Sequence, residues 1–466
     1  MSKKKLISLL VAIVIAIATI LMLPKDMLGV QGRITMGCFL AAIVLWVMDV
    51  FPFVITCFIL MLTLVVTKAA AFGTAFSGMT QTTWWLMLGA MGFSVALSKT
   101  GVLKRISYHV LRMFPPTFNG QILAVAVIGL IISPMIPSVN VKIAMLMPMV
   151  KTISDTIGYG KRSKGAHGLW ATAYASLVLT SLSFATANLF SIIVSGILPE
   201  GGRLGWFQWF IAAIPWTIIC VGGTLLVTAL MFKPAAGDSK EMSKAFIDEE
   251  LAKMGPMSKN EKITLGILIG AVLFWIFESQ IGIASQVTAL IAMILVVVLN
   301  IIDVGELQKG VPWNMLLMVG VMFGIGGVFT ETGINEFITA LFTPIVNSIS
   351  GNIVVFLVAF SLLFSVVRMI VTNVITLFMV FIPLFIPFAA KMGINPWIIG
   401  FIALVSQTHW GMLYMSNFGI PAFGMWGGEE NLDYNQLAKP SWVYCVLNII
   451  AIIVSIPFWK MIGLIG

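Results

Sequence analysis

Two short polar interruptions of long apolar stretches decide the fold. Residues 133–142 read Ser-Pro-Met-Ile-Pro-Ser-Val-Asn-Val-Lys, and residues 368–377 read Arg-Met-Ile-Val-Thr-Asn-Val-Ile-Thr-Leu. They interrupt apolar stretches near 120–150 and 352–390, and we interpret both stretches as re-entrant hairpins that enter and leave the membrane on one side. Broken backbone at membrane depth is tolerated only inside protein or along a cavity, so the two hairpin tips are the first candidates for a binding site.

The composition around these hairpins is typical of a polytopic membrane protein made of helices. Of the 466 residues, 59% are hydrophobic and only 10% are charged, against about 25% charged in soluble proteins. The apolar runs are continuous, whereas a transmembrane barrel shows short alternating segments. The formal charge of +9 does not indicate nucleic-acid binding, because the basic residues punctuate apolar runs. The sequence contains no nucleophile–base pair, metal cluster or P-loop, so we expect neither an enzyme nor a cofactor.

Eleven apolar segments are expected to be membrane spans. We expect Leu6–Leu23 to be a retained first span, because no small-residue cleavage site follows it. The other ten lie at about 34–48, 52–67, 84–112, 170–197, 206–231, 263–277, 284–302, 313–331, 397–424 and 442–464. With the N-terminus inside, nineteen of the 27 Lys and Arg residues are cytoplasmic, six are outside, and Lys142 and Arg368 remain within the membrane. This bias predicts a cytoplasmic N-terminus and an external C-terminus, and we expect the plasma membrane.

The two halves of the chain resemble each other at offsets of 229 to 233 residues. The matching positions are Trp46 and Trp275, Trp84 and Trp313, Lys99-Thr100-Gly101 and Glu331-Thr332-Gly333, Asn140 and Asn373, and Asn188 and Asn417. Each copy holds five expected spans and one hairpin. Five is odd, so the second copy enters the membrane upside down. Inverted repeats with discontinuous helices are typical of secondary transporters, which bind substrate at the midplane between the copies.

The hairpin tips carry the chemistry that we expect to bind a ligand. A half-helix begins near Asn140 and another near Asn373, and each points free amide N–H groups and a positive dipole end into the protein. Two such ends could hold a ligand with two separated negative groups, which is the shape of a dicarboxylate. Lys142 and Arg368 are buried cations, and none of the eighteen Asp and Glu residues falls in mid-membrane. We expect an anion to be their missing partner. His409 could touch substrate or carry a proton, but a packed, hydrogen-bonded histidine is the simpler explanation.

These residues resemble the divalent anion–sodium symporter family of di- and tricarboxylate transporters and exchangers. The resemblance covers nearly the whole length, including Leu45-Trp46, Trp84-Trp85, Val311-Pro312-Trp313 and both hairpins. The family has a Ser-Asn-Thr motif at each hairpin tip, where this chain has Val139-Asn140-Val141 and Thr372-Asn373-Val374. Its usual Gly-Thr-x-x-Asn loop here reads Phe184-Ala185-Thr186-Ala187-Asn188.

The resemblance implies a homodimer in which a transport domain moves against a scaffold as an elevator. The implied division is scaffold at 1–118, transport domain at 119–232, cytoplasmic linker at 233–262, scaffold at 263–350 and transport domain at 351–466. The implied substrate-binding residues are Ser138, Asn140, Val141, Lys142, Thr372, Asn373, Val374, Thr186, Asn188, Ser416 and Asn417. In sodium-coupled members the tips also bind Na⁺ through hydroxyl and carbonyl oxygens, but valine supplies no ligand oxygen.

We therefore expect Lys142 and Arg368 to replace the sodium ions as fixed cations. Unlike sodium, these cations cannot leave with the substrate, so an empty site would cross the membrane with unpaired buried charge. The hypothesis is a sodium-independent obligate exchanger of dicarboxylates such as succinate, malate or 2-oxoglutarate, with no metal and no cofactor. A sodium-coupled di- or tricarboxylate symporter that uses backbone carbonyls is one alternative, and an anion channel is the second.

Overall fold

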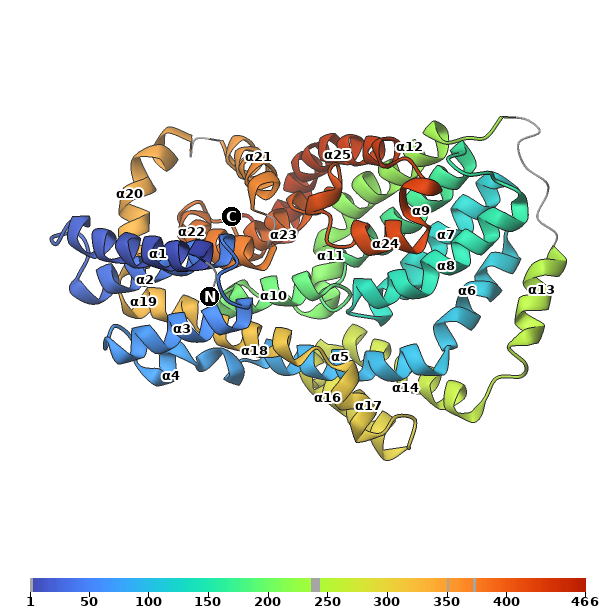
Figure 1. Ribbon diagram of the computed structural model, residues 1–466, viewed down its shortest axis with the longest axis horizontal. Coiled ribbons are helices and arrows are strands. Elements are labelled where there is room, and N and C mark those ends of the chain that lie inside the picture. The colour runs from blue at the N-terminus through green and yellow to red at the C-terminus, as the bar shows by residue number, and fades with distance from the viewer. Residues whose placement is uncertain (1–2, 236–243, 350–351, 372–373) are drawn as a thin grey trace.

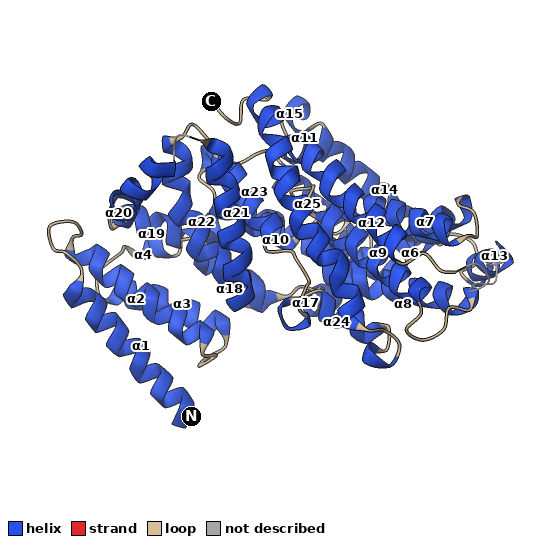
Figure 2. Ribbon diagram, turned by 90° about the horizontal axis from the view of Figure 1, so that it is seen from above, coloured by secondary structure: helices blue, strands red, loops and turns tan. Residues whose placement is uncertain are grey.

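The computed structural model describes residues 3–235, 244–349, 352–371 and 374–466, and helices dominate it (Figures 1 and 2). Within these ranges no strand forms, and an isolated bridge joins Ile394 to Ile465. The predicted all-helical fold class is confirmed.

Within the described residues, the first half of the chain forms twelve α-helices, and a thirteenth lies in the connection to the second half. They are α1 (Lys3–Met22), α2 (Val30–Val47), α3 (Phe53–Val66), α4 (Phe72–Ala75), α5 (Thr82–Thr100), α6 (Val102–Met113), α7 (Phe118–Ile132), α8 (Val139–Ile157), α9 (Lys164–Ser181), α10 (Leu189–Ile197), α11 (Trp206–Trp216), α12 (Gly223–Met231) and α13 (Lys244–Lys253).

In the described part of the second half there are another twelve α-helices. They are α14 (Lys259–Ile276), α15 (Glu278–Ile281), α16 (Ser285–Val298), α17 (Val304–Gly310), α18 (Trp313–Met322), α19 (Ile325–Glu331), α20 (Ile334–Ile349), α21 (Ile353–Ile370), α22 (Val374–Lys391), α23 (Pro396–Ser406), α24 (Gly419–Met425) and α25 (Tyr434–Met461). Short 3₁₀ and π turns join some of them.

Seven helices in the described ranges are long and apolar enough to cross a membrane. An eighth span results if α5 and α6 are counted together, although they bend by 64° around Gly101, whose positive φ of 75° is a conformation that glycine adopts without a Cβ clash. Helix α1 is apolar, largely exposed and at the edge of the molecule (Figure 2), as a lipid-facing helix should be. The count of eleven spans stays a prediction.

The predicted repeat is visible in how each hairpin packs. The arms α7 and α8 both pack on α9, and the arms α21 and α22 both pack on α23. One hydroxyl pair fixes each hairpin to its supporting helix. Ser133 Oγ lies 2.6 Å from Thr180 Oγ1 in the first half, and Ser361 Oγ lies 2.7 Å from Ser406 Oγ in the second. Because a hydroxyl can donate and accept, each pair satisfies polar atoms that lipid and protein would otherwise leave without partners.

Two of the expected spans are each broken by a loop. The segment 170–197 divides into α9 and α10, with an unwound loop at 182–188, and the segment 397–424 divides into α23 and α24, with an irregular loop at 407–418. Hydrophobic composition alone does not reveal these breaks, because buried loops in a membrane protein are lined by apolar side chains while their backbone groups bond inside the protein.

The short helices after these breaks cross between the halves. Helix α10 packs on α22 of the second hairpin, and α24 packs on α8 of the first. Helices α11 and α12 also pack on α25, so the two hairpin regions form one block. The remaining helices pack with one another, as α5 does with α16 and α18, where Trp84 Nε1 donates to the Leu316 carbonyl at 2.8 Å. This crossed arrangement brings both hairpin tips and both unwound loops to one place.

Candidate functional site

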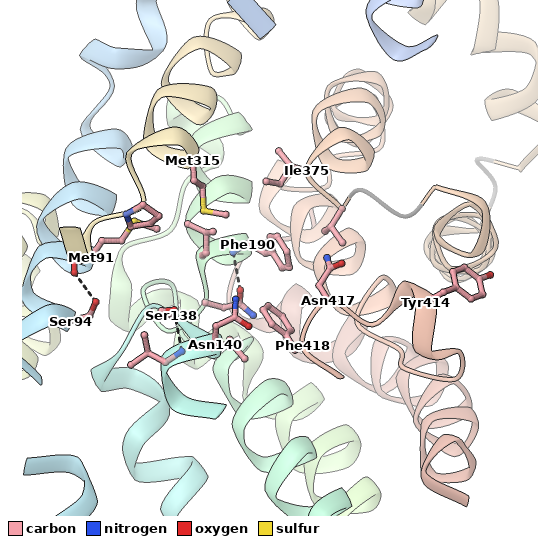
Figure 3. A pocket seen from close by; sticks show the side chains of 17 residues that line it. Met91, Ser94, Ser138, Asn140, Phe190, Met315, Ile375, Tyr414, Asn417 and Phe418 are labelled. Carbon is pink, nitrogen blue, oxygen red and sulfur yellow. Dashed lines mark hydrogen bonds between the residues drawn. The ribbon is translucent and has the colours of Figure 1, made fainter. Parts of the chain in front are cut away.

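A cavity of about 690 Å³ lies where the hairpin tips meet the unwound loops (Figure 3). Its wall on one side comes from α5 and the α17–α18 connection, through Met91, Ser94, Gly310, Pro312 and Met315. The other side comes from the first residues of α8, α10 and α22 and from the loop before α24. None of the seventeen described lining residues is charged.

Three helix N-termini therefore open on this cavity. Helices α8, α10 and α22 begin at Val139, Leu189 and Val374, all of which line it. Local chemistry starts two of these helices: Ser138 Oγ accepts from the Val141 amide at 3.4 Å, and Asn188 Oδ1 accepts from the Phe190 amide at 2.9 Å. The other first-turn amides of α8 and α10 have no intrahelical acceptor, and together with the helix dipoles they make the cavity attractive to anions.

Six of the predicted substrate-binding residues line the cavity: Ser138, Asn140, Val141, Asn188, Val374 and Asn417. The predicted residues Thr372 and Asn373 lie outside the described residues. Three others lie behind the wall, namely Lys142, Thr186 and Ser416, all of which are buried.

The three asparagines that line the cavity differ in whether their side-chain amides already make hydrogen bonds. The side chains of Asn140 and Asn417 are exposed, come from opposite sides of the view in Figure 3, and make no hydrogen bond within the described chain. Asn188 is fully buried; besides capping α10, it donates through Nδ2 to Ser181 Oγ at 3.2 Å. Asn140 and Asn417 therefore have amide donors available for a ligand, whereas Asn188 mainly shapes the loop.

Thr186 and Ser416 hold the unwound loops in place. Thr186 Oγ1 accepts from Trp206 Nε1 at 2.8 Å. Ser416 Oγ lies 2.9 Å from the Tyr174 hydroxyl and accepts from the Gly419 amide at 3.0 Å. Both positions were predicted as ligands, but their hydroxyls are already engaged in supporting the cavity.

Lys142 lies directly behind the first tip and is 0% exposed. Its ammonium donates to the carbonyl oxygen of Ala187, in the unwound loop, at 2.8 Å. It also lies 3.5 Å from the carbonyl oxygen of Ser133, at the end of the first hairpin arm. A fully buried charge normally needs an opposite charge or several oxygen ligands, and here the partners are backbone oxygens from the hairpin and the loop.

Arg368 has a matching environment in the second half. It is 1% exposed, and its guanidinium donates to the carbonyl oxygen of Val371 at 3.0 Å and to that of Met415. Val371 is in the second hairpin, and Met415 is in the second irregular loop. The sequence therefore located both buried cations, and the structure adds that each joins a hairpin to the loop of its own half.

Several cavity residues were not predicted. Phe190 and Phe418 follow the two loop asparagines closely, and their ring centroids lie 5.6 Å apart. An aromatic residue shortly after each loop asparagine is the sequence feature that could have identified them. Ser94 and Tyr414 had no such signal, because they reach the cavity only through the fold. His409 does not line this cavity; it is 2% exposed and its Nε2 lies 3.3 Å from the Ser365 carbonyl oxygen.

The fold and the cavity define a class: this is a multi-pass, all-helical membrane protein with a cavity between two hairpin regions and the other helices. The chain belongs to the family described as the sodium:sulfate symporter transmembrane region, whose model matches residues 3–465. The resemblance found in the sequence is thereby confirmed.

The chain is also similar to several named relatives and to a solved structure. The chain is 26% identical to "Dicarboxylate transporter 1, chloroplastic" of Arabidopsis thaliana over 280 residues, which are 58% of this chain and 50% of that protein. It is 26% identical to "Inner membrane protein YbhI" of Escherichia coli over 357 residues, which are 73% of this chain and 74% of that protein. The crystal structure of the Alcanivorax borkumensis YdaH transporter matches with a TM-score of 0.59 at 14% identity, over 84% of this chain and 88% of that one, and shows the fold alone.

The length of the matches varies among the relatives. The chain spans about half the length of curated relatives such as the Arabidopsis transporter (50%) and a membrane protein of Cupriavidus necator (53%).

Proposed function

We propose that this protein carries dicarboxylates such as succinate, malate or 2-oxoglutarate across the membrane by sodium-independent obligate exchange. Relatives named as dicarboxylate transporters support the substrate class. The cavity supports it chemically, since the N-terminal ends of α8, α10 and α22 and the free amides of Asn140 and Asn417 converge on one uncharged space. Such donors suit a ligand with two separated carboxylates, each of which accepts several N–H groups.

The observation that carries the exchange mechanism is the coordination of Lys142. Its ammonium is bonded by carbonyl oxygens of the hairpin and the unwound loop, which are the hard oxygen ligands that a bound metal cation would use. Arg368 donates to the corresponding pair of segments in the second half. The tip residues Val141 and Val374 add no side-chain oxygen. We infer that fixed cations take the place of Na⁺ on both sides of the substrate.

Fixed cations make the empty carrier slow to return. A sodium ion leaves with the substrate, but Lys142 and Arg368 stay. Without an anion, the buried ammonium of Lys142 would cross the membrane with backbone oxygens as its ligands in the described chain and no opposite charge beside it. Such a charge costs several kcal/mol, and each ~1.4 kcal/mol slows a step about tenfold. Only the loaded carrier then moves at a useful rate, which couples outward movement of one dicarboxylate to inward movement of another.

We propose that the moving part is the block formed by the two hairpin regions, residues 119–232 and 351–466. It slides as an elevator against the scaffold, residues 1–118 and 263–350, within a homodimer in the plasma membrane that has its N-terminus in the cytoplasm. The cavity supports this division, because the scaffold contributes one wall and the hairpin block contributes the other. When the hairpin block moved, a substrate held in the cavity would move away from the scaffold wall.

The test is uptake of labelled succinate into proteoliposomes that contain the purified protein. The vesicles are preloaded with unlabelled succinate or with buffer, and each kind is assayed with and without an inward sodium gradient. The proposal expects saturable uptake into preloaded vesicles only, at equal rates with and without sodium. Uptake into empty vesicles that follows the sodium gradient would establish the symporter instead, and non-saturable uptake without counter-substrate would establish a channel.

A further inference from the structure

A second cavity, of about 500 Å³, lies away from the substrate cavity at the membrane face predicted to be cytoplasmic. Three segments build it: the start of α9, the end of α12 and the start of α25. These helices pack on one another (Figure 1), so the cavity belongs to a single packed unit. Its lining residues are Arg162, Lys164, His167, Met231, Phe232, Asp433, Gln436 and Lys439.

The inner wall of this cavity is held by His167, which is 3% exposed. Its Nδ1 lies 2.6 Å from the Ser163 carbonyl oxygen, and its Nε2 accepts from the Asp433 amide at 2.9 Å. The imidazole also stacks on Phe232, with ring centroids 5.8 Å apart. One side chain thus joins all three segments, and the cavity has a fixed shape before any ligand arrives.

The charges around this cavity are mostly positive. Lys164 and Lys439 are exposed and have neither an ion pair nor a hydrogen bond within the described chain. Arg162 is already engaged by Glu429, whose carbonyl oxygen accepts from Nε at 2.9 Å. Asp433 is the acidic lining residue, and its carboxylate caps α25 by accepting from the Asn435 amide at 2.9 Å. Two lysines therefore remain available to an anion.

Apolar surface lies beside this basic cavity. Leu226 and Leu230, one turn apart on α12, are 61% and 67% exposed, and Leu230 immediately precedes the lining residue Met231. Trp442, three residues after Lys439 on α25, is 40% exposed. Membrane helices that carry basic residues at their ends and exposed apolar side chains along their length match a molecule that has an anionic head and hydrocarbon chains.

We propose that this cavity binds the phosphate of an anionic phospholipid headgroup, with Lys164 and Lys439 as its charged ligands and the acyl chains along the exposed faces of α12 and α25. Each basic residue at a membrane surface contributes about 1 kcal/mol toward anionic lipid, which is about fivefold in affinity. Loss of both lysines should therefore weaken binding about 25-fold. A soluble phosphate compound shares the headgroup chemistry but lacks the chains.

The experiment titrates the purified full-length protein in neutral detergent with dihexanoyl phosphatidylglycerol and measures bound lipid by native mass spectrometry and the midpoint of thermal unfolding. Dihexanoyl phosphatidylcholine tests the need for net negative charge, and inorganic phosphate tests the need for chains. The variant Lys164→Gln/Lys439→Gln removes the proposed ligands. The matched control Lys259→Gln/Lys262→Gln removes two exposed lysines from the start of α14, on the same predicted face but outside this cavity.

We expect phosphatidylglycerol to bind the wild type and the control equally, and to bind the Lys164→Gln/Lys439→Gln variant about 25-fold more weakly. If inorganic phosphate displaces the lipid at a similar concentration, the result would support an anion site at these lysines and would identify a soluble phosphate as its ligand. Equal binding of phosphatidylcholine, undiminished binding to the Lys164→Gln/Lys439→Gln variant, or no binding to the wild type would each overturn the proposal.

Discussion

The two hairpins hold a cation in the same surroundings but supply it from opposite arms. In the first hairpin Lys142 comes from the second arm, α8, and bonds to the carbonyls of Ser133 and Ala187. In the second hairpin Arg368 comes from the first arm, α21, and bonds to the carbonyls of Val371 and Met415. At the repeat offset of 233 residues, Lys142 corresponds to Ile375 and Arg368 corresponds to Met135.

The two halves of the repeat therefore share the positions of the carbonyl oxygens but not the positions of the residues that supply the cations. Both halves place hairpin and loop carbonyls around one point, because both fold a hairpin against a broken helix. Backbone carbonyls at membrane depth need a partner, and any cation that reaches that point can satisfy them. A lysine from one arm and an arginine from the other are two separate solutions to this requirement.

The largest effect should come from removing the cation of the first half. Lys142→Ala leaves the Ala187 carbonyl without its donor and the substrate without a fixed counter-charge, so exchange should fall at least about 100-fold, as expected when a buried charge partner worth 3 kcal/mol or more is lost. Counterflow of labelled succinate measures it. Lys151→Ala, on the same helix but half-buried and paired with Asp155, serves as the control and should retain exchange.

Correct folding of the Lys142 variant must be checked by gel filtration. If the alanine variant aggregates, Lys142→Met keeps the packing volume and tests the same charge. Wild-type exchange by either folded variant would show that Lys142 is not needed for transport.

A smaller effect is expected from changing the shape of the second cation while keeping its charge. In Arg368→Lys an ammonium replaces a planar fork that reaches the Val371 and Met415 carbonyls together. Exchange should fall about tenfold, the equivalent of one lost charge-assisted hydrogen bond, while Arg368→Gln should resemble Lys142→Ala. Initial rates in preloaded vesicles distinguish them. Full activity of Arg368→Lys would mean that charge alone matters at the second tip.

The asparagines separate ligand contact from loop support. Asn140→Ala should raise the KM for succinate about tenfold, because one hydrogen bond to a carboxylate is lost, and should leave thermal stability nearly unchanged. Asn188→Ala removes a helix cap and a buried partner of Ser181, so it should lower the free energy of unfolding by about 1 kcal/mol. Measuring KM and melting temperature for both variants makes the comparison. A loss of stability in Asn140→Ala together with a higher KM in Asn188→Ala would instead make Asn188 the ligand contact and Asn140 the loop support.

The smallest effect on transport should come from Arg105, a buried cation that is paired with a protein carboxylate. Arg105 Nε donates to Glu261 at 2.9 Å, with both side chains largely buried, and also bonds the Gly255 carbonyl beside α13. Glu261→Gln should lower the melting temperature and leave exchange per folded molecule unchanged. If Glu261→Gln folds as well as the wild type but exchanges more slowly, the Arg105–Glu261 pair would belong to the transport machinery.

The same pair predicts a pH dependence of stability. The hydrogen bond from Arg105 lowers the pKa of Glu261. A carboxylate whose pKa is lower in the folded state stabilises fully above its unfolded pKa of about 4.3 and loses this contribution as pH falls through the folded pKa. The melting temperature of the wild type should therefore exceed that of Glu261→Gln at neutral pH, and the gap should close in acid.

Sequence reasoning found the parts of this site that depend on local chemistry. A half-helix was expected to begin near Asn140, and α8 begins at Val139 with Ser138 as its cap. The burial of Lys142 followed from its place in an apolar hairpin. Hydropathy did not predict the helix breaks at 182–188 and 407–418, because each lies inside a segment long and apolar enough to be taken as one span, and the loop that ends at Asn188 was indicated only by the family resemblance. Ser94 was missed because only tertiary packing brings α5 to the cavity. No linear pattern specifies which distant carbonyl a buried ammonium will reach.

The buried positions of Lys142 and Arg368 also have an electrical consequence. In the proposed exchanger, their two positive charges and the two negative charges of a dicarboxylate sum to zero, so the loaded carrier moves no net charge through the membrane field. A potential of 100 mV acts on each uncompensated elementary charge with about 2.3 kcal/mol. Exchange of dicarboxylates should therefore be electroneutral and indifferent to voltage, with its direction set by the two substrate concentrations alone, whereas a trianion such as citrate would carry one charge and feel the potential.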